Sequence, residues 1–212
     1  MSPTIAEELN LRTAGYRRIA GLDEVGRGCW AGPVVAAAVI LPLDRPQLRR
    51  ALRGVNDSKK LTPRQRERLF VVIYQVALSV GVGGAGPSEI DERGIVGATK
   101  AAMERALAML NPQPEALLID AVNLNPNVTL PQRFLNYGDS ISLSIAAASI
   151  IAKVTRDRAM AALDMRYSGY NFAQHKGYGT RAHQAALRHL GVSEVHRKSY
   201  APIQKLTKSM RV

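Results

Sequence analysis

The hydrophobic positions near the N-terminus fall into two short runs that predict paired strands. Residues 17–22 (RRIAGL) and 33–41 (PVVAAAVIL) flank the turn-rich segment DEVGRGCWAG, which is typical of two strands joined as a hairpin. The second run is apolar almost throughout, so we expect a strand that is buried on both faces.

Farther along the chain, strand-like and helix-like patterns alternate. A helix is predicted from Thr62 to Ala77, because the sequence TPRQ combines an N-cap, a proline at the first helical position and a capping-box glutamine. The remaining patterns predict strands at 79–86 and 115–121 and helices at 95–110, 140–165 and 180–190. Strands followed by alternating strands and helices predict a mixed α/β sheet covered by helices.

Amino-acid composition indicates how large a hydrophobic core the chain can form and which class of partner it binds. The chain has 212 residues and is 46% hydrophobic, which suits one compact domain. Its 29 Lys and Arg against 17 Asp and Glu give a net charge of +12, which favours nucleic acid or an anionic membrane surface as partner. A solubility role for this charge stays an alternative.

Other features narrow the class of protein. The single cysteine, Cys29, excludes an intrachain disulfide, and the absence of a CxxC pair argues against a zinc knuckle. The N-terminus has acidic residues and no apolar leader, and no run of about 18 apolar residues occurs. We therefore expect a cytoplasmic protein without a membrane span.

Carboxylates stand at the ends of several predicted elements. Asp23 and Glu24 close the first strand, Asp120 closes the strand ALLID, and Asp139 begins the long helix. If clustered, such groups would raise one another's pKa unless a cation neutralised them. Carboxylate ligands without His or Cys favour Mg²⁺ or Mn²⁺, and hydrolysis of a phosphodiester by two metal ions fits this pattern.

Simpler roles remain open for each acid. Asp139 could be a helix N-cap, and Asp120 could pair with an arginine. Asp23 and Glu24 are neighbours, and neighbouring strand side chains point to opposite faces. We expect the chain to bend at this pair, which Gly26 and Gly28 would permit.

Six segments together resemble the ribonuclease HII family of bacteria, in the order that the family has them. They are spread over most of the chain and read GLDEVGRGCWAGPVVAAAVI, NDSKKLT, LLIDAVNL, GDSISLSIAAASIIAKVTRDRAM, HKGYGT and HRKSYAPI. The resemblance implies an α/β, RNase H-like fold: a central mixed sheet flanked by helices, with a C-terminal helical extension. We expect residues 1–190 to form the catalytic domain and the basic segment 191–212 to pack on or near it.

The resemblance also implies the activity and its metal site. The expected enzyme hydrolyses the RNA strand of RNA/DNA hybrids and cuts 5′ of ribonucleotides embedded in duplex DNA. The expected products are 3′-hydroxyl and 5′-phosphate ends, and the implied role is removal of ribonucleotides from DNA. The four family carboxylates correspond to Asp23, Glu24, Asp120 and Asp139, which would hold two Mn²⁺ or Mg²⁺ ions.

Substrate contacts are expected at three further places. The turn Gly26-Arg27-Gly28 can bring backbone amides against a sugar-phosphate, although a plain hairpin turn explains its glycines equally well. Lys59 can neutralise a phosphate. Tyr178 can offer its hydroxyl to a ribose 2′-hydroxyl, and the flanking Gly177 and Gly179 favour an exposed ring.

Several positions and alternatives qualify this interpretation. Tyr137 and Ile141 stand where the family often has lysine, and we assign Asp157 to pairing with an arginine. The basic tail, with Arg197 and Lys198, is expected to hold the duplex backbone. A monomer is expected, and a sliding-clamp contact is not readable from the sequence. The rival hypotheses are a resolvase-like nuclease of the same superfold and a non-catalytic basic nucleic-acid-binding protein.

Overall fold

A mixed β-sheet forms the centre of the molecule in the computed structural model, which describes residues 2–209. The described residues include one five-stranded sheet with the order β3-β2-β1-β4-β5. The strands are β1 (Ile19–Val25), β2 (Val34–Ile40), β3 (Ser79–Ala85), β4 (Ala116–Asp120) and β5 (Gln132–Leu135). β1 pairs antiparallel with β2 and parallel with β4, so the hairpin and the mixed sheet are both confirmed.

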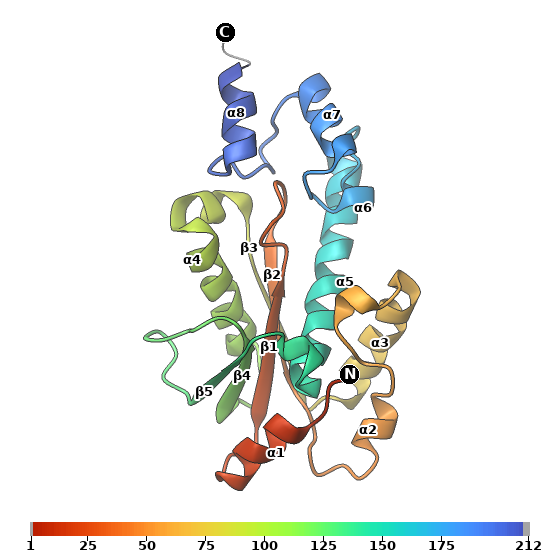
Figure 1. The fold of residues 1–212 in the computed structure, drawn as a ribbon, viewed down its shortest axis with the longest axis vertical. Helices are drawn as coiled ribbons and strands as arrows, with labels where there is room; N and C mark the ends of the chain where they lie inside the picture. The colour runs from red at the N-terminus through yellow and green to blue at the C-terminus, as the bar shows by residue number, and fades with distance from the viewer. Residues whose placement is uncertain (1, 210–212) are drawn as a thin grey trace.

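Helices cover both faces of this sheet (Figure 1). The helices are α1 (Ala6–Thr13), α2 (Leu48–Ala51), α3 (Pro63–Val76), α4 (Pro87–Ala108), α5 (Leu143–Arg166), α6 (Phe172–His175), α7 (Arg181–Leu190) and α8 (Ala201–Ser209). α4 packs on one face, and α5 with α3 packs on the other. Every residue of β2 is buried, because it has neighbours on both edges and helices on both faces.

Local sequence signals explain where the main helices begin. Thr62 and Gln65 form the predicted capping box at the start of α3. The Ser142 side chain accepts a hydrogen bond from the Ile145 amide at the start of α5. Shortly before this cap, Gly138–Ser140 form the short 3-10 helix η2, so α5 begins slightly later than predicted.

The C-terminal helices α6 to α8 add a second, smaller body at one end of the sheet (Figure 1). α6, α7 and α8 share a hydrophobic cluster that includes Phe172, Leu187 and Ile203. α5 reaches this cluster through Met160, so one long helix connects the sheet with the C-terminal helices. No helix among residues 2–209 is long and apolar enough to cross a membrane.

Candidate active site

Acidic residues gather at one edge of the sheet. Asp23 and Glu24 lie near the end of β1, and Asp120 is the last residue of β4. The two strands are parallel, with Leu22 opposite Ile119. Because parallel strands end at the same edge, the three carboxyl groups belong to one region of the surface.

Asp139 reaches the same region from η2. The Gly138 amide donates a 3.0 Å hydrogen bond to the Asp120 carboxylate, which ties η2 to the end of β4. Asp139 is buried and is not the N-cap of the long helix, because Ser142 has that role. Asp57, which the sequence analysis did not single out, is hydrogen-bonded to Asp139 and adds a fifth acid.

These carboxyl groups disfavour one another's charge. Burial raises the pKa of Asp23 well above its usual range, and the charges of Glu24 and Asp120 raise it further. Burial is also the main cause that raises the pKa of Glu24. Burial and then Asp57 raise the pKa of Asp139 to about 6. A bound cation would relieve both the repulsion and the desolvation.

The donor set fits a hard divalent cation. Every acidic group at this edge offers carboxylate oxygens, and Oε2 of Glu24 is buried without a hydrogen-bond partner. Oxygen donors of this kind suit Mg²⁺ or Mn²⁺. Among residues 2–209, no three His, Cys, Asp or Glu side chains already have the geometry to hold one ion. The convergence of the carboxylates to ligand distance therefore stays a prediction.

The expected bend at Asp23 and Glu24 was wrong. β1 continues in regular pairing through both residues, with Asp23 opposite Ala37 and Glu24 opposite Ala36. Ala37 belongs to the core beneath α5, whereas Ala36 belongs to the core beneath α4. The two side chains thus leave the strand on opposite faces, and the chain turns only at residue 26.

The turn after β1 presents two unused backbone donors. The Cys29 amide donates to the Gly26 carbonyl at 3.4 Å, and Gly26 has φ 97°, a conformation that glycine adopts without strain. Within residues 2–209, neither the Arg27 amide nor the Gly28 amide donates to a protein acceptor. A Cβ added at Gly28 would meet nothing within 4 Å, so the turn faces open space.

Tyr178 lies beside the segment that follows this turn. Burial raises the pKa of its hydroxyl, and the Cys29 side chain contributes as well. Tyr178 is 42% exposed, as expected, but the flanking glycines have a different role from the expected one. A Cβ at Gly179 would lie 2.2 Å from the Trp30 ring, and one at Gly177 would lie 2.4 Å from a backbone oxygen. They permit close packing.

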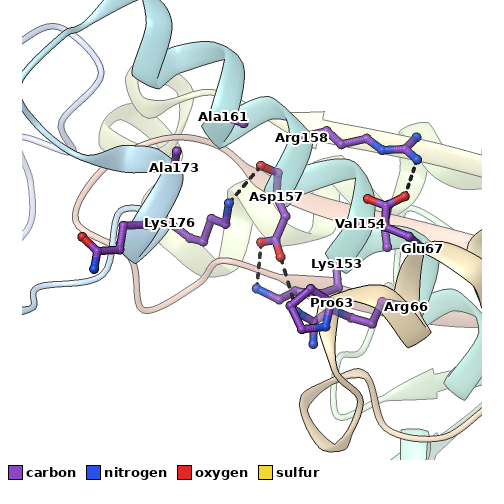
Figure 2. Close-up of a pocket in the computed structure, with 11 residues that line it drawn as sticks. Pro63, Arg66, Glu67, Lys153, Val154, Asp157, Arg158, Ala161, Ala173 and Lys176 are labelled. Carbon is purple, nitrogen blue, oxygen red and sulfur yellow. Dashed lines mark hydrogen bonds and ion pairs between the residues drawn. The ribbon is translucent and has the colours of Figure 1, made fainter.

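A hollow of about 540 Å³ with basic walls lies between α3, α5 and α6 (Figure 2). Nζ of Lys153 is 2.7 Å from the Asp157 carboxylate, and Arg66 is 3.9 Å from it. The expected pairing of Asp157 with an arginine is therefore confirmed. Nζ of Lys176 donates to the Asp157 carbonyl at 3.5 Å, so three cations meet around one acid.

This basic hollow adjoins the acidic edge. The Ser149 side chain hydrogen-bonds with Asp23 and with Ser58, whose Oγ is 2.8 Å away. Lys153 lies one helical turn beyond Ser149 on α5. Lys59 is exposed on the short 3-10 helix η1 (Ser58–Lys60), so cations line the approach from this side.

One expectation for the basic tail was wrong. The Arg197 side chain is fully buried and cannot contact a duplex backbone from there. Lys198 and Lys205 are exposed, whereas the side chain of Lys208 and all of Arg211 lie outside the described part of the structure.

Comparison with known proteins supports the sequence resemblance. The family model described as ribonuclease HII matches residues 20–203. The ribonuclease HII of Geobacillus thermodenitrificans is 55% identical over 198 residues, which is 93% of this chain and 74% of that protein.

Solved structures with the same fold include two at more than 25% identity. The ribonuclease H2 from Pyrococcus horikoshii has a TM-score of 0.73 and 26% identity, covering 92% of this chain and 99% of that one. The RNase HII in the PCNA complex from Archaeoglobus fulgidus has a TM-score of 0.72 and 28% identity, covering 86% of this chain and 95% of that one. Bst-RNase HIII in complex with Mn²⁺ shares the fold at TM-score 0.67 and 21% identity, covering 95% and 72%.

Proposed function

The chain belongs to the ribonuclease HII family and is a divalent-metal-dependent ribonuclease H that acts on RNA/DNA hybrids, and from that premise we propose the residues that carry the reaction. Asp23, Glu24, Asp120 and Asp139 would hold two divalent ions. The observation that carries this assignment is the placement of these carboxyl groups at one sheet edge, where the Gly138 amide ties η2 to the end of β4 and burial raises the pKa of Asp23, Glu24 and Asp139. The unpartnered Oε2 of Glu24 supports it.

The metal ions would supply Lewis acidity to the scissile phosphodiester and to its leaving oxygen. The chain's own groups hold and orient the ligands around them. The Gly138 amide fixes one oxygen of Asp120, Ser149 orients Asp23, and Arg27 lies 3.3 Å from Glu24. The reaction would cut on the 5′ side of a ribonucleotide and leave 3′-hydroxyl and 5′-phosphate ends.

Ribose recognition is assigned to the turn and to Tyr178. The free amides of Arg27 and Gly28 would donate to the ribose 2′-oxygen, and the Tyr178 hydroxyl would contact the same sugar. A 2′-hydroxyl both donates and accepts hydrogen bonds. A site built to pair with a hydroxyl strongly rejects the analogue that lacks it, because its polar groups are then left unpaired.

The duplex backbone is assigned to the basic hollow and to η1. Lys153 and Lys176 in the hollow (Figure 2) and Lys59 on η1 would contact phosphates that flank the cleaved nucleotide. Such contacts position the duplex without reading its sequence. They become weaker as salt increases, because bound counterions are released.

Three further assignments follow from the family and the fold. Residues 191–212 would act as an extension of the catalytic domain 1–190, which the buried Ile203 supports. The enzyme would work as a monomer, and a sliding-clamp contact is proposed from the archaeal likeness alone. Sedimentation of the chain with and without its own clamp would test both of the latter assignments.

One assay tests the central proposal against its rivals. A duplex with a single embedded ribonucleotide is incubated with and without Mg²⁺ or Mn²⁺, beside an all-DNA duplex and an all-DNA four-way junction. We expect metal-dependent cutting 5′ of the ribonucleotide and no cutting of the DNA substrates. Preferential junction cleavage would favour the resolvase-like alternative, and metal-independent binding without cleavage would favour a binding protein.

A further inference from the structure

Two arginines are buried without any carboxylate partner. The side chains of Arg156 and Arg197 are both 0% exposed. Among the ion pairs of residues 2–209, none includes either of them. Apart from the Tyr200 hydroxyl, every hydrogen bond that their guanidinium groups donate goes to a backbone carbonyl. Burying unpaired charge is costly, so the fold keeps these two cations for a specific arrangement.

Arg197 binds the turn that follows β1. It donates to the Gly26 carbonyl at 2.7 Å, to the Arg27 carbonyl at 2.8 Å and to the Gly32 carbonyl at 3.0 Å. The Tyr200 hydroxyl accepts from Arg197 at 2.9 Å and donates to the Arg27 carbonyl at 2.5 Å. The C-terminal segment therefore forms hydrogen bonds near both ends of residues 26–33.

Arg156 binds the same segment from α5. It donates to the Pro33 carbonyl at 2.8 Å and to the Ala31 carbonyl at 3.2 Å. It also donates to the Lys176 carbonyl at 2.9 Å, which links the segment to the turn that carries Tyr178. A Cβ at Gly26 would lie 2.2 Å from Nε of Arg156.

The direction of these carbonyls fixes the direction of the free amides. In a planar trans peptide, the carbonyl of one residue and the amide of the next point opposite ways. The Gly26 carbonyl points at Arg197, so the Arg27 amide points away from it. The Arg27 carbonyl also points at Arg197, so the Gly28 amide points away too. One guanidinium thus orients both donors outward.

We propose that Arg156 and Arg197 are positioning residues that aim the amides of the turn 26–29 at the ribose, so that sugar specificity depends on the C-terminal segment. This inference rests on the proposed function of that turn. Lysine cannot replace either arginine, because a planar guanidinium has five donors in a fixed fork and an ammonium is a compact point charge.

The test compares Arg197→Lys and the milder Tyr200→Phe with Leu187→Ala, which opens a cavity in the same C-terminal core and spares the carbonyls. Two quantities are measured: kcat/KM on a duplex with one ribonucleotide, and its ratio to kcat/KM on the 2′-fluoro analogue. We expect Arg197→Lys to lower the ratio about tenfold or more and Tyr200→Phe about threefold. Leu187→Ala should keep the parent's ratio.

A second measurement does not depend on activity. Hydrogen exchange of the peptide 26–33 should quicken in Arg197→Lys and in Arg156→Lys, relative to the strands of the sheet. A parent-like ratio in both Arg197→Lys and Tyr200→Phe would overturn the inference, as would an equal fall in Leu187→Ala.

Arg27→Pro, compared with Arg27→Ala, separates this inference from the proposed function. Proline removes the amide of residue 27, whereas alanine removes only the side chain. If Arg27→Pro lowers the ratio and Arg197→Lys does not, the turn recognises ribose without the arginines. If Arg27→Pro keeps the ratio of Arg27→Ala, both proposals fail.

Discussion

His183 and His196 share a 3.1 Å hydrogen bond between their Nε2 atoms in the buried C-terminal core. Nδ1 of His183 is 2.9 Å from the Tyr178 carbonyl, so it is the protonated nitrogen of that ring. The Ser193 amide donates to Nδ1 of His196 at 3.0 Å, so His196 carries its proton on Nε2. Both rings are neutral, and burial lowers the pKa of each to about 4.

This pair predicts a loss of stability in mild acid. The unfolded chain takes up protons on these histidines near pH 6.5, whereas the folded chain does so only near pH 4. Stability is therefore lost as pH falls from about 6.5 to about 4, by up to about 3 kcal/mol for one histidine and less than twice that for the pair. Urea unfolding measured across this range would show it.

The buried carboxyl groups act in the opposite sense, because their raised pKa values make the fold more stable as pH falls. Variants of the histidines therefore separate the two contributions to the slope of unfolding free energy against pH. His183→Gln should flatten the slope. His189→Gln on the exposed side of the same helix should keep it. An unchanged slope in His183→Gln would show that the histidine pair does not cause the loss of stability in acid.

Asp23→Asn is expected to raise stability while it removes activity. Asparagine relieves the burial and repulsion that raise the pKa of Asp23, so the metal-free protein should have a larger free energy of unfolding than the parent. Turnover and Mn²⁺ affinity should both fall strongly. Asp164→Asn, at the far end of α5, is the control and should change neither. Undiminished Mn²⁺ affinity in Asp23→Asn would remove this residue from the metal site.

Tyr178→Ala should nearly abolish cleavage at a single embedded ribonucleotide. Tyr178→Phe keeps the ring but loses the hydroxyl, so an intermediate defect of about tenfold is expected, as for the loss of one hydrogen bond. Mn²⁺ affinity should match that of the parent in both variants. Parent-like kcat/KM in Tyr178→Ala would show that this residue only packs against its neighbours.

Arg27→Pro should fall below Arg27→Ala in kcat/KM on the ribonucleotide substrate, because only the proline variant lacks the amide. Residue 27 is the second residue of the turn 26–29, a position that proline tolerates. The deficit should be about tenfold, as for the loss of one hydrogen bond. Steady-state kinetics of the two variants side by side would measure it.

The double variant Lys59→Ala/Lys153→Ala should bind substrate more weakly than the parent, and its Kd should change less with salt concentration. Each lost phosphate contact lowers the slope of log Kd against log salt by about 1. Arg17→Ala is the control, because Arg17 is exposed before β1, at the opposite end of the strand from the acids. A slope equal to the parent's in the double variant would exclude the basic hollow from duplex binding.

Much of the fold could be predicted because its signals are local. The two apolar runs predicted the β1–β2 hairpin, and the capping box of Thr62 predicted the start of α3. β5 was missed because its four residues are partly exposed and carry no alternating pattern. α1 was missed because its one buried residue is Glu8, whose carboxylate accepts from the Ser144 amide at 2.9 Å.

The sequence by itself determined which acids end the strands, because the end of an apolar run is a local property. The tertiary structure alone decided that Asp23 and Glu24 stay in a regular strand and that Asp57 joins Asp139. It also decided that Arg197, which appears in the sequence as one more basic tail residue, is buried against the Gly26 carbonyl 171 positions away. A guanidinium can lie in solvent or bind carbonyls, and which occurs depends on a surface that forms only when distant segments pack together.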